Sequence, residues 1–145
     1  MIDRLQHFTG RKTMMPAPLC AMGSSMLRTY GWVDENRERR NKIYSTYADA
    51  FEDKMKFMPH DCFSCFHAFI LLPDDREEFV KRISDSVQTV RMYPPASEHP
   101  WCKNAARGTM NADEIGKKAV AIPAHAGLSD DDVKSVIKAV MGACT

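Results

Sequence analysis

The residues with the clearest potential for chemistry lie in segment 60–67, which reads His-Asp-Cys-Phe-Ser-Cys-Phe-His. Cys62 and Cys65 have the spacing of half a zinc site, and thiolate and imidazole are the donors that zinc prefers. His99 and Cys102 repeat that spacing further along the chain and could complete a tetrahedral set of ligands. One hypothesis is therefore a small zinc-binding protein.

A second interpretation treats Cys62 and Cys65 as small residues of a hydrophobic core. The run around them is typical of a buried strand, where residues three apart point to opposite faces unless a turn intervenes. A redox Cys-x-x-Cys pair belongs at a helix N-terminus, which lowers the thiol pKa, and this run does not read as one. We therefore expect buried thiols and no metal site, with zinc as the alternative.

The basic run 37–42 could contact phosphate groups. Asp34, Glu35 and Glu38 are interspersed with its arginines and lysine, which is typical of a solvated helix face. We expect such a face here.

Motifs of common enzyme classes are missing from the sequence. There is no Gly-x-Ser-x-Gly nucleophile elbow and no Gly-x-Gly-x-x-Gly loop, and Gly116-Lys117-Lys118 lacks the other residues of a P-loop. The residues taken alone predict no self-sufficient catalytic site.

The first half of the chain predicts two helices. Residues 17–27 are small and apolar, which indicates a buried helix with Gly23 at a close contact. From 33 to about 55 apolar residues recur at three- and four-residue spacing, which predicts a long helix. The residues of its apolar face are Tyr44, Tyr47, Ala48, Phe51 and Met55.

The middle of the chain predicts a strand, a short helix and a second strand. The apolar run 62–72 is too short for a helix and ends at Pro73, so it reads as a buried strand. Asp74 is expected to cap the helix that follows, with Glu77 as its capping-box partner. The second strand is expected at 87–92.

Short-range signals define the last three elements. Asn111 with Glu114 indicates a short helix, and 120–123 reads as a clipped strand. Ser129 with Asp132 forms a capping box ahead of an apolar stripe, which predicts a final helix. About three strands, antiparallel or mixed, packed against helices make an α+β fold.

Composition limits the class of protein. The 145 residues suit one domain, expected over 1–145 with a poorly patterned lead-in at 1–15. A net charge of +1 argues against a dedicated nucleic-acid binder. The longest apolar run is too short to span a membrane, and the N-terminus has no apolar signal core. With five cysteines and no secretion signal, we expect a cytoplasmic protein with reduced thiols.

Several segments in order resemble the DegT/StrS-type sugar aminotransferases. Residues 121–133, Ala-Ile-Pro-Ala-His-Ala-Gly-Leu-Ser-Asp-Asp-Asp-Val, are similar to the strand, turn and helix that close that family's chains. The resemblance extends over nearly the whole chain from Gly10 onward. Its other segments are 10–19, 36–40 with Tyr47, 67–69, 75–77 and 93–95.

The resemblance implies the C-terminal small domain of an aspartate-aminotransferase-like fold and pyridoxal phosphate as cofactor. Lys12 stands nearest the position that contacts the cofactor phosphate of the neighbouring subunit, although the family usually has Asn there and Met14 replaces a common Arg. Tyr93 and His125 occupy signature positions that imply substrate contacts. No catalytic residue is carried over, because the family's Schiff-base lysine belongs to its large domain.

The chain alone is therefore expected to be catalytically silent. Within an intact enzyme, an amino donor such as glutamate would load the cofactor, and the amino group would pass to a keto-sugar, usually nucleotide-linked. The expected partners are an aminotransferase large domain or a homodimer partner, and neither nucleic acid nor membrane. The alternatives are a stand-alone binding module without catalysis and the zinc protein described above.

Overall fold

The structure is a computed structural model that describes residues 17–29, 31–59, 68–91, 94–98, 100–102 and 110–144. By contacts, the chain divides between Asn36 and Arg37 into two compact units. The elements are α2 (Ala17–Thr29), α3 (Trp32–Phe51), β1 (Phe69–Leu71), α4 (Arg76–Ile83), β2 (Val90–Arg91), a 3-10 turn (Ala96–Glu98), α5 (Met110–Lys118), β3 (Val120–Ile122) and α6 (Asp130–Ala143).

The described strands form one antiparallel sheet with the order β1-β3-β2, so the last strand in sequence lies in the middle. Phe69 is opposite Ile122 on one side of β3, and Val90 is opposite Ala121 on the other. The expected α+β fold with about three strands is confirmed, and the sheet is antiparallel rather than mixed.

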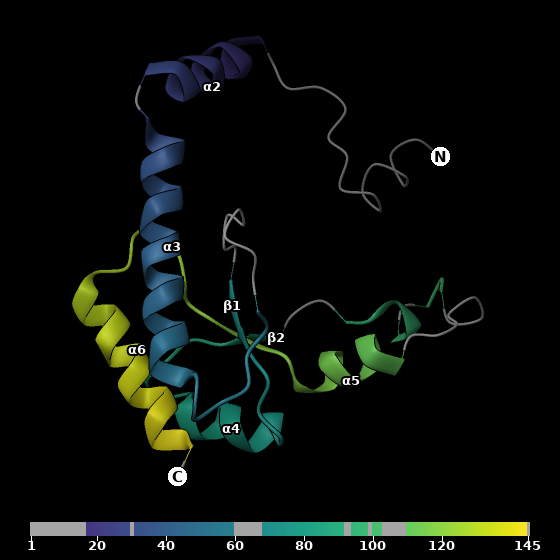
Figure 1. The fold of residues 1–145 in the computed structure, drawn as a ribbon. Coiled ribbons are helices and arrows are strands. Elements are labelled where there is room, and N and C mark those ends of the chain that lie inside the picture. Colours follow the sequence, from purple (N-terminus) through teal and green to yellow (C-terminus); the bar gives the residue numbers. More distant parts are fainter. Residues whose placement is uncertain are drawn as a thin grey trace. The chain divides into compact units, whose positions relative to one another are not determined.

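One face of this sheet carries the core. Successive residues of a strand point to opposite faces, and Phe69 and Leu71 of β1 share a face with Val120 and Ile122 of β3. All four are almost completely buried. They pack in one cluster with apolar residues of α3, α4 and α6 (Figure 1).

Phe69 lies at the centre of an aromatic group. Its ring centroid is 4.9 Å from that of Tyr44, 5.3 Å from Tyr47, 5.9 Å from Phe51 and 5.2 Å from Phe57. The first three partners are on α3 at the spacing that predicted its apolar face, so that prediction is confirmed.

Helix α3 ends four residues earlier than predicted. The chain turns after Phe51, whose carbonyl accepts hydrogen bonds from the amides of Lys54 and Met55. Phe57 then forms an antiparallel bridge with Leu71 and covers the outer edge of β1. This pairing with a distant strand ends the helix and leaves no periodic signal in the sequence.

The start of α4 also differs from the prediction. Asp75, not Asp74, is the N-cap, and its Oδ1 accepts a 3.0 Å hydrogen bond from the amide of Glu78. Asp74 instead pairs with Lys118 of α5 at 3.0 Å. Adjacent aspartates offer the same local signal, and Lys118 lies too far along the chain for a local pattern to include it.

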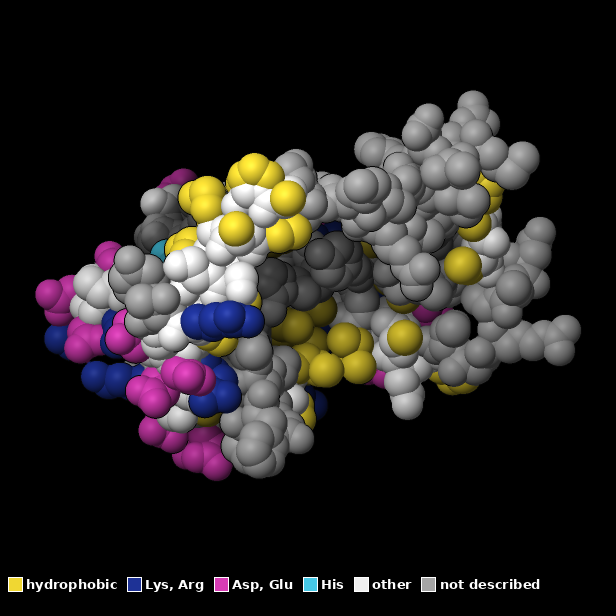
Figure 2. All heavy atoms as spheres, turned by 90° about the horizontal axis from the view of Figure 1, so that it is seen from above, with side chains coloured by type: hydrophobic (Ala, Val, Ile, Leu, Met, Phe, Trp, Pro, Cys, Tyr) yellow, Lys and Arg dark blue, Asp and Glu magenta, His cyan; other side chains and the backbone are white. Residues whose placement is uncertain are grey.

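Helix α2 is a helix as predicted, but its predicted burial is wrong. An added Cβ on Gly23 would meet nothing within 4 Å, so this glycine makes no close contact. Figure 2 shows hydrophobic side chains, in yellow, at the surface of the molecule. Four large apolar side chains of α2 are exposed to about half or more. They are Leu19, Met22, Met26 and Leu27.

The later elements follow the prediction. Helix α5, strand β3 and helix α6 lie where the short-range signals placed them, and the Ser129–Asp132 capping box is present. Of the predicted strand 62–72, residues 62–67 lie outside the described residues, and β1 covers 69–71 of the rest. Of the predicted strand 87–92, β2 covers 90–91, and residue 92 lies outside the described residues. No helix in the described ranges is long and apolar enough to cross a membrane.

Candidate functional site

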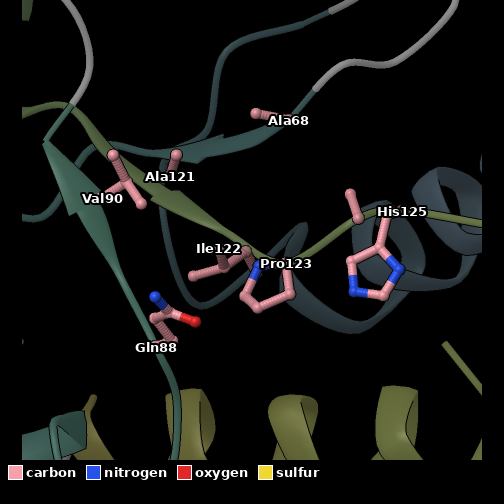
Figure 3. A pocket seen from close by; sticks show the side chains of 8 residues that line it. Ala68, Gln88, Val90, Ala121, Ile122, Pro123 and His125 are labelled. Carbon is pink, nitrogen blue, oxygen red and sulfur yellow. The ribbon is translucent and has the colours of Figure 1, made fainter. Parts of the chain in front are cut away.

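A pocket of about 320 Å³ lies beside the central strand β3 (Figure 3). It opens where β2 leaves β3, since the pairing of the two strands among the described residues begins at Val90, after Gln88. The lining residues are Ala68, Gln88, Val90, Ala121, Ile122, Pro123, Ala124 and His125.

Most of this lining is aliphatic. In Figure 3 the Ala121 methyl and the Ile122 side chain leave β3 in opposite directions, so the pocket meets both sides of this strand. The small side chains at Ala68 and Ala121 leave space that a larger residue would fill. An apolar wall of this kind can pack against the hydrophobic face of a ligand.

His125 and Gln88 supply the hydrogen-bonding side chains of the pocket. Both are exposed, and in Figure 3 the His125 ring lies beyond Pro123, while the Gln88 amide lies below Ile122. An imidazole and an amide both donate and accept hydrogen bonds, which suits a neutral, hydroxyl-rich ligand.

A tight turn presents His125. The His125 carbonyl accepts a 3.2 Å hydrogen bond from the amide of Leu128. Gly127 lies against the ring, since a Cβ added there would be 3.2 Å from His125 Nδ1. A side chain at position 127 would therefore require the imidazole to move by a few tenths of an ångström.

Helix α3 supports both ends of this turn. The hydroxyl of the fully buried Tyr47 donates a 3.0 Å hydrogen bond to the carbonyl of Pro123. Burial, helped by the charge of Asp132, raises the pKa of Tyr47 to about 12. On the other side, Arg39 donates to the Leu128 carbonyl at 2.5 Å and to Asp130 Oδ1 at 2.6 Å.

Arg39 therefore corrects the interpretation of the basic run as a solvated face. Its side chain is only 24% exposed and joins α3 to the start of α6. Arg37 and Lys42, in the same run, are exposed as expected. The partners of Arg39 are about 90 residues away, so sequence periodicity could not reveal them.

The start of α6 completes the support of the turn. The Ser129 side chain accepts a hydrogen bond from the Asp132 amide, and the Asp132 carboxylate accepts one from the Ser129 amide. Hydrogen bonds from the Ser129 hydroxyl and amide, with a smaller effect of the His125 charge, lower the pKa of Asp132.

Of the site residues predicted from the sequence, His125 lies at the pocket. Lys12 and Tyr93 lie outside the described residues, and so do Cys62, Cys65 and His99. Cys102 is half-buried, and no group of three or more potential metal ligands occurs among the residues that are described. The zinc hypothesis therefore stays untested.

Gln88 was not singled out from the sequence. The available signal was the alternation of Val87, which is buried, with Gln88, which is exposed. That alternation indicates that Gln88 faces away from the core, but it does not indicate that Gln88 and His125 line the same pocket.

A protein-family model identifies the family of this chain. The model of the DegT/DnrJ/EryC1/StrS aminotransferase family matches residues 3–141. None of the curated proteins matches the sequence.

Solved structures share the fold. An aminotransferase, TlmJ from Streptoalloteichus hindustanus, is 25% identical with a TM-score of 0.68, and the match covers 83% of this chain and 34% of TlmJ. A sugar aminotransferase from Micromonospora echinospora is 20% identical with a TM-score of 0.68, covering 75% and 31% of the two chains. PseC, a Helicobacter pylori aminotransferase involved in the biosynthesis of pseudoaminic acid, is 17% identical with a TM-score of 0.68, covering 85% and 36%. This chain thus spans about a third of the length of these structures.

Proposed function

Because this chain belongs to the DegT/DnrJ/EryC1/StrS aminotransferase family, we propose that it is the C-terminal small domain of an enzyme that transfers an amino group to a keto-sugar. The match over residues 3–141 is the observation that carries the proposal. The family consists of sugar aminotransferases that use pyridoxal phosphate. The α+β fold and the pocket beside β3 support the assignment.

The pocket itself does not fit pyridoxal phosphate. That cofactor needs a lysine for its imine and a carboxylate beside its pyridinium nitrogen. The lining holds neither, since its polar side chains are Gln88 and His125. The proposal therefore places the cofactor and the chemical step on a large domain, and the 145 residues alone are inactive.

We assign the pocket of this domain to the sugar. Nucleotide-linked keto-sugars are neutral and hydroxyl-rich at the ring, which matches an imidazole and an amide on an apolar wall. His125 and Gln88 would hold hydroxyl groups, and the aliphatic side chains would exclude water from that side of the ring. Tyr93 is proposed as a further substrate contact, and Lys12 as a contact to the cofactor phosphate across a homodimer interface.

A chimera tests the assignment. The chain would replace the matching third of TlmJ, which leaves the large domain of that aminotransferase in place. We expect the chimera to retain pyridoxal phosphate after desalting, measured by absorbance, and to convert it to the amino form when glutamate is added. The isolated chain should retain none. A correctly folded chimera without cofactor would contradict the proposal and favour a stand-alone binding module.

Substitutions in the chimera then test the pocket. His125→Ala should raise KM for the keto-sugar by about tenfold, the effect of losing roughly one hydrogen bond to the ligand, while cofactor retention stays unchanged. Ser135→Ala is the control, because the hydroxyl of this exposed serine donates to the carbonyl of Asp131 in its own helix, and Ser135 does not line the pocket. An unchanged KM in His125→Ala would remove the pocket from the proposed site.

A further inference from the structure

Two side chains of α3 hold the segment that carries His125, one on each side of it. Tyr47 binds the carbonyl of Pro123 two residues before the histidine. Arg39 binds the carbonyl of Leu128 three residues after it and the carboxylate of Asp130 beyond that. Tyr47 and Arg39 are eight residues apart, about 2.2 helical turns, so their side chains leave α3 roughly 80° apart and reach different parts of the segment.

Arg39 binds two acceptors of this segment at once, at the Leu128 carbonyl and at the Asp130 carboxylate. One guanidinium nitrogen is 2.6 Å from Asp130 Oδ1, and the other is 2.5 Å from the Leu128 oxygen. A planar fork fixes two acceptors at once, which a lysine ammonium cannot reproduce. Lys42 reaches the same carboxylate only at 3.9 Å, with its side chain 68% exposed.

The contact to Leu128 passes directly to the turn. The Leu128 amide donates to the His125 carbonyl, while the Leu128 carbonyl accepts from Arg39. Asp130 is the first residue of α6, so the same guanidinium fixes the end of the turn and the start of the helix. Without Arg39, the turn would lose one of its two links to α3, and its internal hydrogen bond would open more often.

We propose that Arg39 is a positioning residue that, together with Tyr47, sets the place of the His125 imidazole at the pocket. The inference rests on the proposed role of His125 as a substrate contact. Arg39 does not line the pocket and acts through the turn.

The first test measures the turn itself, in the full 145-residue chain. Amide hydrogen exchange at Leu128, followed by NMR, reports the bond to the His125 carbonyl. Arg39→Ala should speed this exchange by about tenfold, and Arg39→Lys should restore only part of the protection.

Arg82→Ala is the matched control. Arg82 also joins one carboxylate, Glu78 at 3.0 Å, to one backbone carbonyl, that of Ala143 at 3.3 Å, but at the opposite end of α6. It should leave exchange at Leu128 unchanged. Equal acceleration in both variants, or none in Arg39→Ala, would overturn the proposal.

Two further measurements keep the result decisive. If Arg39→Ala does not fold, Asp130→Asn weakens one arm of the fork at an exposed position and should speed Leu128 exchange by about threefold; unchanged exchange would overturn the proposal. In the chimera, Arg39→Ala should raise KM for the keto-sugar by about tenfold with little change in kcat, whereas Arg82→Ala should not. If His125→Ala leaves KM unchanged, the assignment of the pocket to the sugar fails, while the exchange data still decide whether Arg39 holds the turn.

Discussion

At the scale of single residues, Tyr47 joins the core to the candidate site. Its ring stacks on Phe51 and meets the edge of Phe69, and its hydroxyl reaches the Pro123 carbonyl. Burial disfavours the phenolate, and the nearby charge of Asp132 adds to this effect. The side chain is therefore both a core residue and a support for the turn that carries His125.

The raised pKa of Tyr47 predicts a pH dependence of stability. Because the folded pKa of about 12 lies above the unfolded value of 10.0, the unfolded chain loses this proton first as pH rises. The contribution of Tyr47 is complete below pH 10 and is lost between about 10 and 12. Urea unfolding from pH 8 to 11 should show the free energy of unfolding falling at the alkaline end.

Tyr47→Phe supplies the comparison. It should lower the free energy of unfolding at pH 8 by about 1–3 kcal/mol, because the Pro123 carbonyl loses its hydrogen-bond donor. Its stability should also fall less steeply above pH 10. An equally steep fall in the variant would show that another group causes the alkaline loss.

At the scale of elements, the two neighbouring aspartates before α4 have different roles: Asp75 caps the helix, and Asp74 pairs with Lys118. Asp75→Ala removes the N-cap and should cost about 1 kcal/mol in the free energy of unfolding, measured by urea titration. Asp74→Ala removes an exposed ion pair with Lys118 and should cost less than about 0.5 kcal/mol. If Asp74→Ala proves the more costly of the two, Asp75 is not the effective cap.

Two helix glycines make a second contrast. A Cβ on Gly116 of α5 would lie 2.8 Å from the ring of the buried Pro95, whereas one on Gly142 of α6 would meet nothing within 4 Å. Gly116→Ala should therefore lower the unfolding temperature, because overpacking reduces the free energy of unfolding by about 1–3 kcal/mol. Gly142→Ala should gain about 0.5–1 kcal/mol from helix propensity. A stabilising Gly116→Ala would show that Pro95 moves freely.

At the scale of the whole molecule, α2 carries a group of exposed apolar side chains. Leu19, Met22, Met26 and Leu27 are exposed at helical spacing, and residues up to Asn36 form a compact unit separate from the core. An apolar surface of this kind favours association in water. The isolated chain should therefore self-associate as its concentration rises.

Charge placed on α2 should reduce that association. Leu19→Glu with Met26→Glu is expected to shift the chain toward monomer in sedimentation velocity, without lowering the stability of the core unit. Ser24→Glu with Ser45→Glu is the charge-matched control, since both serines are exposed and no apolar surface is lost. If the control disperses the chain equally, charge rather than apolar contact sets the behaviour.

The sequence by itself determined the family and the elements with strong local signals. The capping box at Ser129 and the stripe of Val133, Val136 and Val140 were enough to place α6. The three- and four-residue spacing of Tyr44, Tyr47 and Phe51 was enough to identify the inner face of α3. These patterns depend on residues within one or two helical turns of each other, so they can be recognised directly in the sequence.

Only the tertiary structure decided the contacts between distant segments. It placed β3 between β1 and β2, ended α3 by pairing Phe57 with Leu71, and put Gln88 and His125 in the lining of one pocket. It also showed that Arg39, which the charge pattern assigned to solvent, binds a turn about 90 residues away in the sequence. Such pairings depend on how whole elements pack. Neither periodicity nor capping residues predict which distant residue a side chain will contact.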